Sequence, residues 1–213
     1  MTPHDHHSSE SHGHHHGGGR HGARQPEAFN PARAALLDDP ARFEHLPPDK
    51  ILELLDAPAG ALVIDFGTGT GTFAIELARR RPDLRIVALD NQPAMLELLR
   101  AKPEAKSLRN LEPLLTAEVG RLAASADRIL AINVLHELDD EALGQLKSLL
   151  KPGGVVLFID WDSAIERPIG PPKDHTYTAA EARARLESLA LRVEELPAMK
   201  YHFVLRARRA ERA

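Results

Sequence analysis

Residues 63–71 read Val-Ile-Asp-Phe-Gly-Thr-Gly-Thr-Gly, an apolar run that leads directly into a loop with glycine at every second position. The short apolar segment 61–66 is typical of a buried parallel strand. The glycines allow a sharp turn and a close approach of the backbone to a ligand, and residues 72–81 have the apolar pattern of a helix. A strand, a glycine loop and the start of a helix together predict a nucleotide site.

The spacing of the glycines separates two kinds of nucleotide site. A dinucleotide fingerprint needs G-x-G-x-x-G, but here the third glycine comes one residue early and Thr72 stands at the last position of that motif. The pattern is instead Asp-x-Gly-x-Gly-x-Gly, with Asp65 two residues before Gly67. A carboxylate at this place offers nothing to a pyrophosphate, whereas it suits a cationic amino-acid group.

This pattern resembles the first motif of the class I S-adenosylmethionine-dependent methyltransferases. In that family the loop wraps the methionine part of the cofactor, and the acidic residue holds the cofactor's amino group, usually through water. The resemblance implies S-adenosyl-L-methionine as the cofactor and contacts from Asp65, Gly67, Thr68, Gly69 and Gly71. The alternative is an ordinary tight turn beside a surface Asp.

A second acidic residue supports the resemblance. Residues 84–89 are predicted to form the next strand, which ends in Asp90 and Asn91. A carboxylate at this strand end is placed to accept hydrogen bonds from both ribose hydroxyls. Nicotinamide-dinucleotide enzymes share that feature, so Asp90 by itself does not choose between the two families.

Composition limits the other classes of protein. A chain of 213 residues with 43% hydrophobic content is long enough for one well-packed domain. Its net charge of −4 argues against binding nucleic acid through bulk electrostatics. No apolar stretch approaches the roughly 20 residues that span a bilayer, and there is no signal-peptide pattern. We therefore expect a cytoplasmic protein, and the absence of cysteine excludes disulfides and thiolate sites.

Residues 1–24 form a separate, polar segment that carries eight of the twelve histidines. We expect this tail to be disordered, because it has too few apolar residues to offset the entropy of folding. It is either a binding segment for divalent metal, which neutral imidazoles suit, or a solvated leader. The candidate ligands are His4, His6, His7, His12, His14, His15, His16 and His21.

Residues 25–58 are predicted to be a helical cap over the cofactor site, with helices near 32–37 and 49–55. In the resembled family such helices close over cofactor and substrate. Several side chains here either line a substrate pocket or simply pack: Phe29, Arg33, Arg42, Phe43 and His45.

Residues 59–213 are predicted to form the cofactor domain. Strands alternate with helices to about residue 160, which favours a doubly wound α/β fold. The expected strands are 61–66, 84–89, 111–116, 128–133 and 155–160, and the third of them is expected to be interrupted by Pro113. A terminal pair, 191–196 and 201–207, completes a mostly parallel, seven-stranded Rossmann-like sheet. The turn Lys-Pro-Gly-Gly at 151–154 is expected before the fifth strand, and Thr178 with Glu181 form a capping box that begins a helix.

Ligands in such a sheet bind beyond the carboxyl ends of the strands. The third strand end normally frames the adenine, so Ala117 and Glu118 are candidate contacts, although Glu118 also suits a plain helix start. The resemblance makes Asn133 a wall of the cofactor pocket. His136 is either a general base for the acceptor or a structural hydrogen-bonding residue.

Two further features stay open in the sequence. Trp161, which follows Asp160, is either an aromatic wall for the sulfonium or part of the core. The segment 165–177 is either a substrate lid or a rigid proline-rich connector. Taken together, the motifs predict a methyltransferase that acts on a small-molecule acceptor. One alternative is a nicotinamide-dinucleotide oxidoreductase, and another is a non-catalytic cofactor-binding protein that handles or senses metal through its histidine tail.

Overall fold

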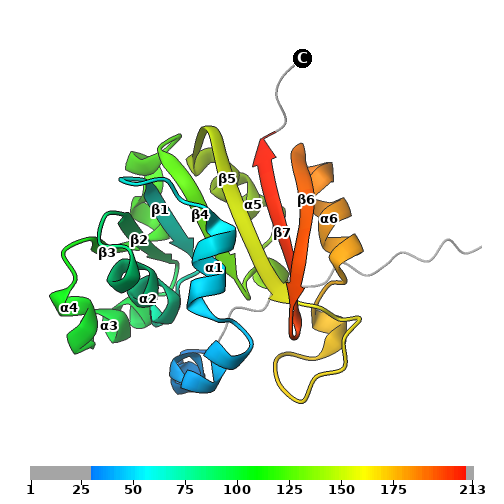
Figure 1. Ribbon diagram of the computed structural model, residues 1–213, viewed down its shortest axis with the longest axis horizontal. Helices are drawn as coiled ribbons and strands as arrows, with labels where there is room; N and C mark the ends of the chain where they lie inside the picture. Colours follow the sequence, from blue (N-terminus) through cyan, green and yellow to red (C-terminus); the bar gives the residue numbers. More distant parts are fainter. Residues whose placement is uncertain (1–29, 210–213) are drawn as a thin grey trace, which may run out of the picture.

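The computed structural model describes residues 30–209, and within them seven strands form a single sheet in the order β3-β2-β1-β4-β5-β7-β6. Figure 1 shows the sheet with helices in front of it and behind it. The strands are β1 Leu62–Phe66, β2 Arg85–Asp90, β3 Leu111–Leu115, β4 Ala126–Ile132, β5 Leu150–Trp161, β6 Leu191–Met199 and β7 His202–Arg209.

The strand directions confirm the predicted doubly wound fold. Strands β3, β2, β1, β4 and β5 pair in parallel, whereas β7 runs antiparallel to both β5 and β6. The order reverses between β1 and β4, because β2 and β3 lie on one side of β1 and the later strands on the other. Ligands of such sheets bind at this switch point, beyond the carboxyl ends of the strands.

Helices cover both faces, and each face has its own apolar core. Side chains of α1, α2 and α3 pack with alternate residues of the central strands, such as Val63 and Leu130. Side chains of α5, α6 and η3 pack on the opposite face with the intervening residues, such as Ile64 and Ile129. The helices are α1 Pro48–Leu55, α2 Thr72–Arg80, α3 Pro93–Ala101, α4 Pro103–Ser107, α5 Asp140–Leu149 and α6 Ala179–Ser188, with 3-10 turns η3 Thr116–Leu122, η4 Leu135–Glu137 and η5 Lys173–His175.

The predicted first helix of the cap is present, but it is a 3-10 helix and not an α-helix. Residues 32–37 lie in a 3-10 helix, η1 Pro31–Asp38, and a second one follows, η2 Pro40–Glu44. Each of these segments begins with a proline behind a side-chain cap, Asn30 for η1 and Asp39 for η2. The second cap comes so soon after the first that no long α-helix can form across residue 39. The predicted helix at 49–55 is present as α1.

Two strand predictions also need correction. The third strand is not interrupted at Pro113, which pairs opposite Ala88; β3 is an edge strand, where the missing amide of proline costs no ladder hydrogen bond. The segment 151–154, predicted as a turn, lies within the long strand β5. The pairing of β5 with β4 is irregular at this point, because the register shifts between the pair formed by Ala126 and the pair formed by Arg128.

The carboxyl ends of the parallel strands meet at one edge of the molecule. In Figure 1 the arrowhead of β5, the blue η1–η2 segment and the yellow loop after β5 all lie toward this lower end. The turn between β6 and β7 lies there too, since β7 starts opposite Trp161. Within residues 30–209, no helix combines the length and hydrophobicity that crossing a bilayer requires.

Candidate functional site

The glycine loop leaves β1 after Phe66 in a conformation that few other residues tolerate. Gly67, Gly69 and Gly71 have φ angles of 70°, 57° and 77°, which is the left-handed region where a Cβ is strained. A Cβ on Gly67 would lie 2.6 Å from Val134 Cγ1, and one on Gly71 would overlap Leu99 Cδ1. The amides of Gly67 and Thr68 donate to the Leu89 carbonyl, at 2.8 and 2.9 Å. The loop is therefore fixed against the end of β2.

Asp65 lies beneath this loop and is 3% exposed. Its Oδ2 accepts a hydrogen bond of 2.6 Å from the Thr68 hydroxyl. Burial raises the pKa of Asp65 to about 6, and the nearby charge of Asp90 adds to the rise, while Thr68 and Arg42 oppose it. A buried carboxylate of this kind is stabilised by a cation, so the position fits the amino group of an amino-acid-like ligand.

Asp90 ends β2 and is 6% exposed. Its Oδ2 accepts from the Gly69 amide at 2.7 Å, and its Oδ1 accepts from the Gln92 amide at 2.9 Å. Burial raises the pKa of Asp90, although these backbone hydrogen bonds oppose the rise. The structure thus brings the two predicted acidic residues to the same loop, with acceptor oxygens suited to ribose hydroxyls.

Three other predicted cofactor residues are exposed and lie directly after β2 and β3, at the carboxyl edge of the sheet. Asn91 is exposed directly after β2, and Ala117 and Glu118 are exposed in the first turn of η3. Glu118 Oε2 accepts from the Leu115 amide at 3.4 Å, which is the helix-start role considered for it in the sequence.

Asn133 follows β4 and adopts a positive φ of 56°. Its amide donates to the Ile159 carbonyl at 2.8 Å, yet its buried Oδ1 has no hydrogen-bond partner within residues 30–209. An unpaired buried acceptor is costly, so this atom fits a site that a ligand donor completes. Val134, the next residue, is the one that would clash with a Cβ at Gly67.

The 3-10 helix η1 packs against the glycine loop and the start of α2. Asp38 Oδ1 accepts from the hydroxyls of Thr70 and Thr72, at 2.6 and 2.8 Å, and from Lys102 Nζ at 2.6 Å. Leu37 Cδ1 would lie 2.9 Å from a Cβ on Gly69.

The side chains that were predicted to line a pocket or to pack differ in their surroundings. Arg33 is exposed, whereas Arg42 stacks on Phe73 and His45 is buried. Phe43 packs at the edge of Phe73, and Phe29 lies outside the described residues.

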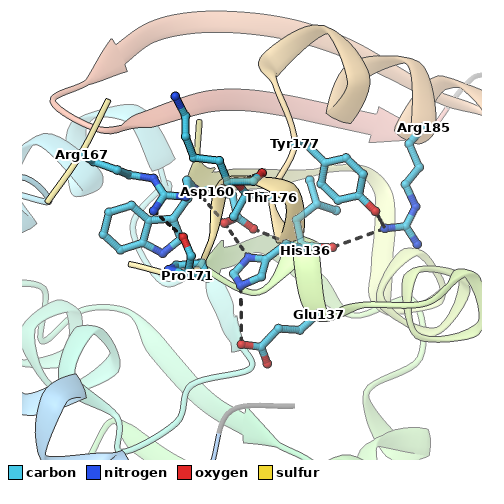
Figure 2. Close-up of polar contacts among 11 residues, drawn as sticks. His136, Glu137, Asp160, Arg167, Pro171, Thr176, Tyr177 and Arg185 are labelled. Carbon is cyan, nitrogen blue, oxygen red and sulfur yellow. Dashed lines mark hydrogen bonds and ion pairs between the residues drawn. The ribbon is translucent and has the colours of Figure 1, made fainter. Parts of the chain in front are cut away.

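His136 and Asp160 form a pair that the sequence did not connect. Asp160, at the end of β5, is 1% exposed, and its Oδ1 lies 2.8 Å from His136 Nδ1. Figure 2 shows the imidazole between Asp160 and Glu137, whose Oε1 lies 3.7 Å from His136 Nε2. Burial lowers the pKa of His136, but the charge and hydrogen bond of Asp160, helped by Glu137, outweigh it and leave that pKa raised. The signal that could have linked them is positional, since His136 follows β4 and Asp160 lies at the end of the adjacent parallel strand β5.

Arg185 of α6 holds the turn that carries His136. Its guanidinium donates to the carbonyls of Leu138 at 2.7 Å and Leu135 at 3.4 Å. It also donates to the Tyr177 hydroxyl at 2.9 Å (Figure 2) and to Asp140 at 3.0 Å.

Arg167 holds the loop after β5. It donates hydrogen bonds to the carbonyls of Ile169 and Pro171 and to the Thr176 hydroxyl, and its guanidinium lies over the Trp161 ring. These contacts favour a braced connector over an open lid.

His202, the first residue of β7, is a polar residue of this edge that sequence reasoning missed. It has no exposed surface, and neither ring nitrogen has a hydrogen-bond partner in the described part of the chain. Its ring packs on Trp161 with 4.2 Å between centroids, and burial lowers its pKa to about 3. Trp161 is thus a buried wall beside His202. A single histidine at the start of a terminal strand carries no sequence signal of this kind.

The histidine tail, with the metal ligands predicted for it, lies outside the described residues. Among residues 30–209, no group of three or more His, Cys, Asp or Glu side chains is arranged to hold a metal ion.

Comparison with known proteins places this geometry in context. The family described as a methyltransferase domain matches residues 41–203. A trans-aconitate 2-methyltransferase of Methylobacterium radiotolerans is 34% identical over 60% of this chain and 47% of its own length. A demethylmenaquinone methyltransferase of Deinococcus radiodurans is 34% identical over 46% of this chain and 42% of its own. The matches thus span less than half of either curated relative.

A solved structure gives wider coverage. The crystal structure of a SAM-dependent methyltransferase from Aquifex aeolicus superposes with a TM-score of 0.77 at 30% identity, over 84% of this chain and 98% of that one.

Proposed function

Because this chain belongs to the class I S-adenosylmethionine-dependent methyltransferases, we propose that it transfers the methyl group of its cofactor to a small-molecule acceptor. The cofactor is S-adenosyl-L-methionine, which supplies a methyl group already activated on a sulfonium. The work left to the protein is to align acceptor and donor and to exclude water.

We infer which residues hold the cofactor from the fit of the site. Asp65 suits the cationic amino group, and the loop of Gly67, Thr68, Gly69 and Gly71 suits the methionine part. Asp90 and Asn91 suit the ribose, and Ala117 and Glu118 lie at the strand end that suits the adenine. The unpaired Oδ1 of Asn133 supports a ligand donor at the end of β4. In the same proposal, residues 25–58 form the cap and residues 59–213 the cofactor domain.

The observation that carries the choice of acceptor is the burial of polar side chains at the end of β5 and in the elements packed against it. Asp160 and His202 are almost fully enclosed, and His45 is nearly so. The flat surface of a macromolecule does not reach such groups, whereas a small molecule that is enclosed by the site can pair with them. The names of two of the curated relatives, which refer to trans-aconitate and demethylmenaquinone, support a small acceptor.

Transfer of a labelled methyl group tests this proposal. The full chain is incubated with S-adenosylmethionine carrying a tritiated methyl and with fractions of small metabolites, protein or RNA. We expect label in the small-molecule fraction, and none with a Gly69→Val variant. Label in protein or RNA alone would contradict the proposed acceptor. Cofactor binding without any transfer would favour the alternative of a non-catalytic cofactor-binding protein. No observation in residues 30–209 supports that alternative.

A further inference from the structure

We propose that Asp160 is a positioning residue that makes Nε2 of His136 the general base, and that the acceptor therefore attacks through an atom that carries a proton at neutral pH. The inference rests on the proposed function, because it names the class of acceptor for the same site. The two side chains, His136 and Asp160, lie outside the glycine-loop motif and are paired at the ends of β4 and β5.

The geometry fixes which ring nitrogen of His136 carries its proton. Asp160 Oδ1 lies 2.8 Å from Nδ1, and Oδ2 accepts from the backbone amide of His136 at 3.1 Å. The amide of Trp161 also donates to Oδ1, at 2.7 Å, so the carboxylate cannot turn away. An ionised carboxylate only accepts hydrogen bonds. The neutral imidazole must therefore hold its proton on Nδ1 and present the lone pair on Nε2.

Nε2 is the nitrogen left for a substrate. Its nearest recorded partner, Glu137 Oε1 at 3.7 Å, is beyond hydrogen-bond length. The turn that carries His136 borders the glycine loop, since Val134 lies against Gly67. Arg185 braces that turn through the Leu135 and Leu138 carbonyls. A base held in place beside the cofactor loop can act without reorganising the backbone.

The surrounding charges set when this base is active. Burial lowers the pKa of His136, and Arg167 lowers it further, but Asp160 and Glu137 face the ring and raise it above its ordinary value. Arg185 contacts this turn through the carbonyls of Leu135 and Leu138, and Tyr177 contacts Arg185 (Figure 2). Because the base form exists only above this raised pKa, methyl transfer should increase as the pH rises through that pKa.

A positioned base limits the acceptor. A carboxylic acid is already ionised at neutral pH and gains nothing from a base, whereas an alcohol, a phenol or an ammonium group must lose a proton. In the proposed step the acceptor O–H or N–H bond breaks and the proton moves to Nε2. The acceptor atom forms the new bond to the methyl carbon, and the electron pair of the broken S–C bond stays on sulfur.

NMR titration of the full, cofactor-free chain tests the pairing without any acceptor. A His136→Gln variant identifies the ring signals, and ¹⁵N spectra report the tautomer. We expect the Nδ1–H form at high pH, and in Asp160→Asn we expect the titration midpoint of His136 to move to lower pH. Asp162→Asn, a neighbouring carboxylate without contact to the ring, should leave it in place. The Nε2–H tautomer in the unmodified protein, or an unmoved midpoint in folded Asp160→Asn, would overturn the proposal.

Activity with chosen acceptors tests the class of substrate. Tritiated methyl transfer is measured with small phenols, alcohols, amines and carboxylates as probes. For a phenol, alcohol or amine, His136→Gln should lower kcat by ~100-fold or more, and Asp160→Asn should shift the acid limb of the pH profile to lower pH. A carboxylate methylated equally well by His136→Gln would overturn the inference. Binding of S-adenosylhomocysteine is measured in parallel, and its absence would count against the proposed function without changing the tautomer result.

Discussion

The carboxylate of Asp90 accepts a hydrogen bond from the amide of Gly69, with 2.7 Å between Oδ2 and the nitrogen. This bond joins the end of β2 to the middle of the glycine loop, so the residue proposed to hold the ribose also fixes the loop proposed to hold the methionine part. Both halves of the cofactor site therefore depend on one side chain.

Replacing Asp90 with Asn should weaken cofactor binding by roughly 10- to 100-fold, because hydrogen bonds to a charged group contribute about 1.5–3 kcal/mol. Calorimetric titration with S-adenosylhomocysteine measures the change. Asp83→Asn is the matched control, since Asp83 lies just before β2 at its other end and pairs with Arg81. Equal affinities in the two variants would exclude Asp90 from the site.

The raised pKa of Asp65, about 6 through burial and the charge of Asp90, predicts a pH dependence of binding. The cationic amino group of the ligand pairs with the ionised carboxylate, so affinity should fall as pH drops below about 6. The free energy of unfolding of the unliganded protein should gain a contribution over the same range, because the native carboxyl takes up its proton before the unfolded one does. In Asp65→Asn both dependences should be reduced; a profile identical to that of the unmodified protein would refute the assignment.

His202 should destabilise the unliganded protein. Its pKa is held at about 3 by burial, so the unfolded state takes up a proton first and stability falls as pH drops below the ordinary histidine value. His202→Leu should remove this acid-side loss and raise the free energy of unfolding at neutral pH by about 1 kcal/mol. Denaturant unfolding at several pH values measures both effects, with His175→Leu at an exposed site as the control. A stability loss in His202→Leu would mean that the ring nitrogens are already paired.

Asp38 should hold the cap segment on the glycine loop. Asp38→Ala removes the acceptor shared by Thr70, Thr72 and Lys102, so η1 should exchange its amide hydrogens faster and affinity for S-adenosylhomocysteine should fall several-fold. Hydrogen exchange read by mass spectrometry over residues 31–44 measures the first effect. Asp174→Ala, an exposed change in η5, is the control, and unchanged exchange in Asp38→Ala would show that the cap is held by its apolar contacts instead.

The sequence predicted the parts of the site that depend on backbone geometry. The glycines at 67, 69 and 71 adopt positive φ angles, and the apolar runs that lead to Asp65 and Asp90 are typical of buried parallel strands. These positions therefore follow from local chemistry. The doubly wound, mostly parallel sheet follows from the alternation of strands and helices.

Contacts between distant side chains could not be predicted in the same way. The pairing of His136 with Asp160 depends on the register of β4 and β5, and the packing of His202 on Trp161 depends on the β5–β7 pairing. Neither register is encoded in a local motif. The 3-10 form of η1 could not be predicted, because the apolar spacing of residues 32–37 is also that of an α-helix. The two successive starts, each a side-chain cap followed by a proline, leave no room for one.

Calorimetric titration of S-adenosylhomocysteine into Gly69→Val and Gly153→Val is the most direct test of the cofactor site. Both glycines have positive φ angles, so both variants carry the same kind of backbone strain, but only Gly69 donates to Asp90 and faces Leu37, whereas Gly153 has open space. We predict micromolar binding in the unmodified chain and in Gly153→Val, and none in folded Gly69→Val. Unchanged affinity in Gly69→Val would show that the glycine loop does not hold the cofactor.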